Sequence, residues 1–583
     1  MTARHSRQAA VVLGVLLAAG EAAYVVAGRA AVARAFARND DRVLHHLLTG
    51  PSAVTLADYL EIADFWAIAI AIGIGATVVA LALWPFADRA MERLYAWLGR
   101  ACDACLSWRR LTLVAGSVIC LAILSWVALG VLRDFPNSGD ENGYLYEAET
   151  FTLGRVTNPA HALQAFFEQS WVREVDGRVF GIFPPGWPTV LALARVAHMP
   201  RWLVNPVLGC ISLLLLFGVG RRLYDERTAL LAVVVTFASS TFLFHGGSYF
   251  SHTFCSVLML ASAYLGTRAI DERRTAFAAW VGAVMGLALL TRNYTSIWCG
   301  LPFGLALLGK GRFGARALAA ALAAGVPFVL IYIAYNAATT GHSFVTGLSG
   351  TFGSFDRQFF PPGWIGRAAE NTGTRIVELM VWMPPAILGL YAWWWKATPR
   401  TRWRFTDFIF PSLFIGYFIY MDRGGNRYGP RFYYEALPLV ALAAVAPLLR
   451  EASYREKRAA GRFAFYAFVL SMVAALPLLA WHVRVESRVI RERQEPYRLA
   501  AEQRLNQAVV LVSTKSGYER PMNIMDLTRN GTGFSGSVLW ALDFGPDNRR
   551  LMDYYPDRTF YRYRFDRLRR AGTIERVAAE PNR

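Results

Sequence analysis

The stretch RDFPNSGDENGYLYEAETFTLGR, Arg133 to Arg155, decides how the chain is organised, because it comes directly after a long apolar run. That run, residues 111–131, is long enough to cross the roughly 30 Å hydrocarbon core of a bilayer. The acids Asp140 and Glu141 follow it within ten residues. A membrane helix that opens onto an acidic, aromatic loop predicts chemistry at a membrane surface.

The residues after this acid pair have helical periodicity. Tyr144, Ala148 and Phe151 recur at helical spacing, and Gly154 follows. We expect an amphipathic helix that lies on the membrane and ends at Gly154. A structural alternative is that Asp140 only caps the N-terminus of this helix.

The composition places the whole chain in the membrane class. Of 583 residues, 55% are hydrophobic and 18% are charged. The net charge of +19 is divided among short arginine clusters between apolar runs, a pattern that sets membrane topology and argues against nucleic-acid binding. The pair Cys102 and Cys105 lacks the further ligands of a zinc site and indicates an ordinary loop.

The apolar runs predict an all-α polytopic membrane protein with about thirteen transmembrane helices. They lie at residues 9–28, 65–87, 111–131, 203–220, 228–244, 251–268, 275–291, 295–309, 315–337, 376–395, 405–420, 435–449 and 463–482. With the N-terminus inside, the alternate loops that hold most Lys and Arg lie on the inner side. Residues 132–202 and 338–375 then lie outside, and residues 184–199 form a short interfacial helix.

Three regions follow from this pattern. Residues 1–110 hold two N-terminal helices and a basic cytoplasmic loop, and residues 111–482 form the main transmembrane domain. Residues 483–583 change in character: AVVLVSTKSGYERPMNIMDL, GSVLWALDF and PDRTFYRYRFD are typical of short strands. We expect a small α/β or mainly β domain there, on the outer side.

The unusual polar residues gather in the predicted outer loops. In MDRGGNRYGPRFYYEALP, Arg427 and Arg431 stand among glycines, and the planar guanidinium group is well suited to a phosphate. Arg292 ends a predicted helix on the same face. An alternative is that the arginines anchor the chain to anionic lipid headgroups.

Further candidates lie in the same loops. Tyr144, Trp187 in FPPGWPTVLALA, Tyr428 and Asp356 in TFGSFDRQFFPPGW are candidate substrate contacts. His252 in HGGSYFSH is a candidate metal ligand, although an interfacial histidine is more often only hydrogen-bonded.

The motifs SGDENGYLYEAETFTLGR, FPPGWPTVLALA and YGPRFYYEALP, in this order, resemble the GT-C superfamily of integral-membrane glycosyltransferases. They are most similar to the bacterial branch that includes protein O-mannosyltransferase-like and lipid A aminoarabinose transferase-like enzymes. The resemblance covers most of residues 110–450.

The resemblance implies a polyprenyl-phosphate-linked sugar donor and an inverting transfer to an acceptor hydroxyl on the periplasmic face of a bacterial inner membrane. The acceptor is a glycolipid, a polysaccharide or a protein. Asp140 occupies the catalytic position of the family, beside Glu141, and would act as general base. Arg431, Arg427 and Arg292 would hold the leaving phosphate.

The sequence leaves open the use of a metal ion and one alternative function. Many members carry a second acid that completes a metal site, but GGSYFSH has no carboxylate, which leaves a divalent cation (Mg²⁺ or Mn²⁺) and a ligand role for His252 open. The alternative function is a polysaccharide or lipid transporter or flippase. Transporters place ionisable residues in the middle of their helices, whereas here they gather at one face.

Overall fold

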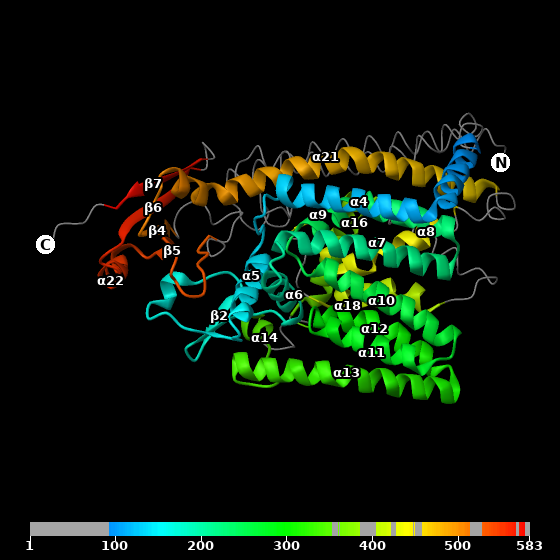
Figure 1. Ribbon diagram of the computed structural model, residues 1–583, viewed down its shortest axis with the longest axis horizontal. Coiled ribbons are helices and arrows are strands. Elements are labelled where there is room, and N and C mark those ends of the chain that lie inside the picture. The colour runs from blue at the N-terminus through cyan, green and yellow to red at the C-terminus, as the bar shows by residue number, and fades with distance from the viewer. Residues whose placement is uncertain are drawn as a thin grey trace.

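The computed structural model describes residues 92–352, 360, 362–384, 404–420, 427–446, 448, 458–513, 527–566 and 571–577. A bundle of long helices carries a small sheet at one end (Figure 1). The α-helices of the bundle are α4 (Arg109–Trp126), α7 (Val204–Leu223), α8 (Glu226–Phe237), α9 (Ser240–Gly247), α10 (His252–Asp271), α11 (Thr275–Leu289), α12 (Asn293–Leu308), α13 (Gly311–Thr340), α16 (Trp364–Trp382), α18 (Ile409–Phe418), α19 (Leu437–Val445) and α21 (Arg458–Glu502).

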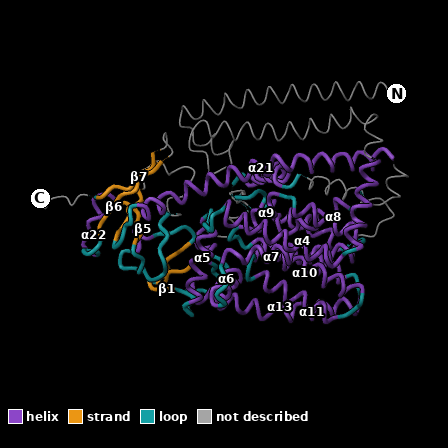
Figure 2. Tube along the Cα trace, turned by 45° about the horizontal axis from the view of Figure 1, so that its top comes forward, coloured by secondary structure: helices purple, strands orange, loops and turns teal. Residues whose placement is uncertain are grey.

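Shorter elements lie near the sheet end of the bundle or connect its helices. The helices are α5 (Gly139–Thr152), α6 (Gly186–Val196), α14 (Gly347–Phe352) and α22 (Asn548–Tyr554), with a π-helix at η1 (Val127–Val131) and 3₁₀ turns at η2 (Gln164–Phe167), η3 (Arg201–Leu203), η4 (Phe405–Phe408), η5 (Arg431–Ala436) and η8 (Gly545–Asp547). The strands gather at the same end of the molecule (Figure 2).

Two sheets are present in the described residues. Strands β1 (Asn158–Pro159), β2 (Val172–Val175) and β3 (Arg178–Gly181) form an antiparallel sheet in the order β1-β3-β2. Strands β4 (Ala508–Ser513), β5 (Val538–Asp543), β6 (Thr559–Asp566) and β7 (Ala571–Arg576) pair in the order β5-β4-β6-β7, with β7 antiparallel and the rest parallel. The predicted C-terminal strands are therefore confirmed, in a mixed α/β arrangement.

The chain is a multi-pass membrane protein, but the expected count of about thirteen spans is not confirmed. Four described helices are long and apolar enough to cross a bilayer, or five if α8 and α9, bent by 68°, form one span. Helices α11, α18 and α19 have only 15, 10 and 9 residues. The predicted spans 9–28 and 65–87 lie outside the described residues, and 376–395 does so in part.

The C-terminal sheet is joined to the bundle by one long helix. Helix α21 has 45 residues and runs from the far end of the bundle to the sheet (Figure 1). The predicted change of character at residue 483 thus falls inside a continuous helix, and the sheet itself starts at Ala508.

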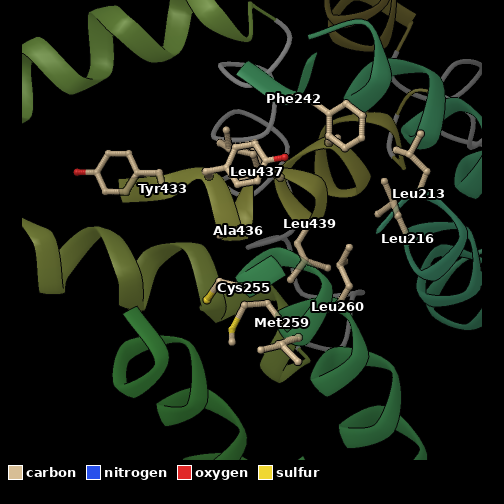
Figure 3. Packing of buried hydrophobic residues seen from close by; sticks show 14 of the residues in the cluster. Leu213, Leu216, Phe242, Cys255, Met259, Leu260, Tyr433, Ala436, Leu437 and Leu439 are labelled. Atoms are coloured by element: carbon tan, nitrogen blue, oxygen red, sulfur yellow. The ribbon is translucent and has the colours of Figure 1, made fainter. Parts of the chain in front are cut away.

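The bundle packs around a core of aliphatic, aromatic and sulfur-containing side chains where α7, α9, α10 and α19 meet (Figure 3). It includes Leu213, Leu216, Phe242, Cys255, Met259, Leu260, Leu437 and Leu439, all less than 10% exposed. Because α19 follows η5 directly, this core also fixes the 3₁₀ turn that starts at Arg431.

Helix α5 differs from its expected surface position. It starts one residue before Asp140, and Ser138 is its N-cap, accepting a hydrogen bond from the Glu141 N–H. Its residues are buried on several sides, because α6, β3 and α13 pack around it; for example, Tyr335 of α13 donates a hydrogen bond to Glu147. It ends as expected before Gly154, whose φ of +69° is left-handed.

Candidate active site

A pocket that is open to solvent, with a volume of about 780 Å³ when the open part is included, lies where the start of α5 meets the start of α12 and the turn η5. Its polar lining includes Asp140, Arg431 and Arg292. Its other lining residues are Tyr144, Trp171, Ile182, Phe183, Pro184, Thr291, Asn293, Tyr294, Thr295, Leu348, Tyr417, Tyr420 and Phe432. The elements that form it lie toward the sheet end of the bundle (Figure 1).

The close approach of the glycine-containing turn before α6 to the turn before α12 shapes this pocket. The N–H of Gly186, at the start of α6, donates a 2.7 Å hydrogen bond to the carbonyl oxygen of Leu290, just before Arg292. A Cβ at residue 186 would lie 2.7 Å from that oxygen, so only glycine allows the contact. The glycine of FPPGWP therefore brings Pro184 next to the start of α12.

Asp140 and Arg431 form an ion pair inside the pocket, between Oδ2 and Nη1. The side chains are 16% and 6% exposed, so both groups are largely shielded from water. The Arg431 guanidinium also lies 5.2 Å from the centre of the Phe250 ring, a cation–π contact. A carboxylate in such a position is available to take a proton, and the arginine supplies positive charge beside it.

Arg292, the N-cap of α12, lines the pocket and forms an ion pair with Glu435, which does not line it. Its Nε lies 2.9 Å from Glu435 Oε1, and the same oxygen lies 2.9 Å from Nδ1 of His252. Glu435 and His252 are completely buried. This arrangement fixes the arginine with its charge partly neutralised.

The described residues around the pocket do not form a metal centre. His252 faces Glu435 and Arg292, and it does not line the pocket. Across the described residues, no three His, Cys, Asp or Glu side chains gather in a way that would hold a metal ion.

Glu141 is adjacent to Asp140 but turns away from the pocket. Its carboxylate accepts hydrogen bonds from the N–H of Asn137 (2.7 Å), the hydroxyl of Ser138 (3.3 Å) and the N–H of Tyr249 (2.8 Å). Burial raises the pKa of Glu141 to about 7, although the hydrogen bonds and Arg427 act in the opposite direction. Glu141 thus connects the backbone at Asn137, just before α5, to the backbone at Tyr249, between α9 and α10.

The remaining predicted residues divide between pocket and framework. Tyr144 lines the pocket and its hydroxyl is 3.1 Å from that of Ser251. Arg427 donates from Nε to the Asn137 carbonyl at 2.9 Å, and the Tyr428 hydroxyl accepts from the Asn137 side chain at 3.1 Å.

Trp187 is also a framework residue. The sequence made it a candidate substrate contact, but the side chain is fully buried and its indole donates to the Tyr249 carbonyl at 2.8 Å. Neither Arg427, Tyr428 nor Trp187 lines the pocket. Asp356 lies outside the described residues.

Beyond Tyr144, the aromatic residues that line the pocket were not anticipated from the sequence. Trp171, in the loop before β2, has a φ of +61°, a left-handed conformation that is unusual for tryptophan. Its indole packs on the first turn of α5, where a Cβ at Gly139 would lie 2.7 Å from Nε1. The only local sequence signal is the glycine pair of GDENG, since Gly143 likewise makes room for the Phe183 ring.

A second aromatic group lines the pocket on α12, α18 and η5. The rings of Tyr294 and Tyr420 stack at 5.2 Å, and those of Tyr417 and Phe432 at 4.4 Å. Aromatic surfaces with a few convergent charged groups are typical of pockets for polar organic ligands.

Comparisons with known proteins agree with this arrangement. Residues 189–339 match a protein-family model described as dolichyl-phosphate-mannose-protein mannosyltransferase. Residues 508–582 match a second one, described as a domain of unknown function. No curated protein matches the chain in sequence.

Solved structures resemble this chain at low sequence identity. The crystal structure of ArnT from Cupriavidus metallidurans bound to undecaprenyl phosphate has a TM-score of 0.52 and 12% identity, over 82% of this chain and 99% of that chain. The oligosaccharyltransferase of Archaeoglobus fulgidus in its apo form has a TM-score of 0.43 and 10% identity, over 77% of this chain and 69% of that chain. The mannosyltransferase match over residues 189–339 and the fold shared with ArnT confirm the resemblance to the GT-C superfamily of integral-membrane glycosyltransferases.

Proposed function

We propose that the chain transfers a glycosyl group, with inversion, from a polyprenyl-phosphate-linked sugar to an acceptor hydroxyl, and that Asp140 is the general base. The observation that carries the proposal is the convergence of Asp140, Arg431 and Arg292 on one pocket at the sheet end of the bundle. ArnT, which shares the fold, binds undecaprenyl phosphate, and this supports the donor class.

The reaction needs a base on one side of the sugar and an anion site on the other. The acceptor oxygen attacks the anomeric carbon while its proton passes to the Asp140 carboxylate. The bond between the anomeric carbon and the phosphate oxygen breaks, and the polyprenyl phosphate leaves as an anion. Arg431 and Arg292 stabilise the negative charge that develops on this phosphate.

Arg431 has two partners in this scheme. In the structure it holds Asp140, and in the donor complex the phosphate would compete for the same guanidinium. When the donor phosphate binds Arg431, the Asp140 carboxylate is freed from the ion pair and can turn to the acceptor hydroxyl. Tyr144, Trp171 and Phe183 would then contact the sugar beside Asp140.

The other predicted residues take a supporting place in the proposal. Glu141, Arg427, Tyr428 and Trp187 hold the backbone around the pocket through the hydrogen bonds given above. No step is assigned to a metal ion, because the described residues offer no group of ligands for one. The acceptor would be a glycolipid, a polysaccharide or a protein, on the periplasmic side of a bacterial inner membrane.

The test is transfer from a polyprenyl-phosphate sugar by the full chain in lipid vesicles. Asp140→Asn should lower transfer by about 10²- to 10⁴-fold, the usual contribution of a general base, and should still bind the lipid. Asp176→Asn is the matched control, because Asp176 lies in the same loop region and is 84% exposed. Unchanged transfer by Asp140→Asn would remove the catalytic assignment. Movement of intact lipid-linked sugar across the membrane would support a flippase instead.

A further inference from the structure

The C-terminal sheet packs against the loop region that contains the proposed active site. Phe166 and Phe167 of η2 are buried together with Val509, Leu511 and Leu539 of the sheet in one hydrophobic cluster. Polar contacts add to this interface: the Thr528 hydroxyl donates to the Glu168 carbonyl, and His161 Nε2 lies 2.8 Å from the Tyr555 hydroxyl. The sheet is therefore part of one packed unit with the region around α5.

The chain reaches α5 through a segment in an unusual backbone conformation. We call residues 133–137, between η1 and the N-cap of α5, the pre-helix segment. Its first two residues, Arg133 and Asp134, have φ values of +56° and +51°. Two consecutive left-handed residues without glycine persist only where the surroundings hold them, and such conformations are enriched at functional sites.

Contacts from α21 and from the C-terminal domain hold this segment, in addition to the Tyr249 hydroxyl, which donates a hydrogen bond to the Asp134 carboxylate. Gln494 of α21 donates to the Arg133 carbonyl at 3.2 Å. Arg529 of the C-terminal domain donates from Nη2 to the Pro136 carbonyl at 2.9 Å, and its guanidinium lies 4.3 Å from the centre of the Phe135 ring. The same ring meets Tyr497 of α21 edge-on at 5.7 Å.

Asn137, the last residue of the segment, connects these contacts to Asp140. Its carbonyl accepts from Arg427 and from Arg493 of α21. Its side-chain amide donates to Glu486 of α21 at 2.8 Å, and its N–H donates to Glu141. Asn137 is fully buried and lies three residues before Asp140, so any shift of the segment moves the first turn of α5.

We propose that the C-terminal domain and α21 form a clamp on the pre-helix segment and thereby set the position of Asp140 in the pocket. Arg529 is the positioning residue that the C-terminal domain contributes: it does not line the pocket, and it acts through Pro136 and Phe135. The proposal gives a role to the domain of unknown function at residues 508–582, and it rests on the proposed glycosyl transfer.

The kinetic test compares Arg529→Ala, Arg529→Lys and the control Arg550→Ala in the full chain. Arg550 lies exposed on α22 of the same domain. A misplaced base slows the chemical step, so Arg529→Ala should lower kcat by about 10- to 100-fold while KM for the donor stays within about twofold. Arg529→Lys keeps a cation and one donor and should recover part of kcat. Arg550→Ala should match the unmodified chain.

Hydrogen exchange provides a readout that does not need activity. In Arg529→Ala, amide exchange should become faster in residues 133–141 and remain unchanged in α7 and α10. If kcat is unchanged, or if its loss follows only a general loss of thermal stability, the clamp does not position Asp140. If the unmodified chain shows no transfer, the proposed function fails, while faster exchange confined to residues 133–141 still supports the clamp and unchanged exchange refutes it.

Discussion

Arg431 holds the carboxylate of Asp140 although the two residues are 291 positions apart in the chain. One arrives on the first turn of α5 and the other on the turn η5, which is fixed by the core behind α19. The pair is largely shielded from water, so its charges interact strongly. It connects the two motifs of the sequence that carry most of the polar chemistry.

Arg292 and Arg427 should differ in their effect on lipid binding. Arg292→Lys keeps the positive charge that pairs with Glu435 but loses the planar guanidinium, which can donate two hydrogen bonds to a phosphate. We expect about tenfold weaker binding of polyprenyl phosphate, roughly 1.4 kcal/mol. Arg427→Lys should stay within about twofold, since the Arg427 guanidinium donates to Asn137 outside the pocket. Fluorescence titration in detergent measures both, and equal losses would place Arg427 at the phosphate.

Trp171 should recognise the sugar and not the lipid. Aromatic pairs contribute about 0.5–1.5 kcal/mol beyond area burial, and we take the same range for an indole that packs on a sugar ring, so Trp171→Ala should weaken binding of the sugar-bearing lipid by about 2- to 10-fold. Binding of polyprenyl phosphate without sugar should not change. Trp171→Phe retains a ring, so its affinity for the sugar-bearing lipid should lie between those of the unmodified chain and Trp171→Ala. An equal loss for both lipids would show that Trp171 only supports the pocket.

Glu141 should make stability depend on pH. Its pKa is raised from 4.5 to about 7 by burial, so between these values the folded chain holds a proton that the unfolded chain releases. The stabilisation is complete below pH 4.5 and is lost as the pH rises through about 7. Between pH 5 and 8, the melting temperature should fall more steeply with rising pH for the unmodified chain than for Glu141→Gln. Parallel curves would contradict the burial effect.

Gly186→Ala should destabilise the contact between α6 and the start of α12. The new Cβ would lie 2.7 Å from the Leu290 carbonyl oxygen, a backbone atom that cannot rotate away. Strain of this kind typically costs about 1–3 kcal/mol. Gly304→Ala in α12 is the control, because no atom lies within 4 Å of its Cβ position. The melting temperature should fall only for Gly186→Ala, and a fall in both would point to a general effect of alanine.

Much of the helical pattern could be predicted from the sequence, because apolar runs and loop charges reflect the membrane directly. The C-terminal strands followed from alternating residues in the same way. The burial of α5 did not, since local residue patterns do not show which elements cover a helix: α6 and β3 fold back onto it, and Tyr335 reaches it from α13. Nor could residue patterns show that α21 continues past residue 483 to Glu502.

By itself, the sequence determined the chemical types at the site: an acid pair after an apolar run, arginines among glycines, and aromatic loops. Tertiary structure alone decided which member of each pair faces the pocket. Adjacent helical residues point about 100° apart, so Asp140 turns to Arg431 while Glu141 turns to the N–H of Tyr249. Likewise Arg431 lines the pocket and Arg427 binds Asn137, because the positive φ of Tyr428 and Gly429 turns the chain between them.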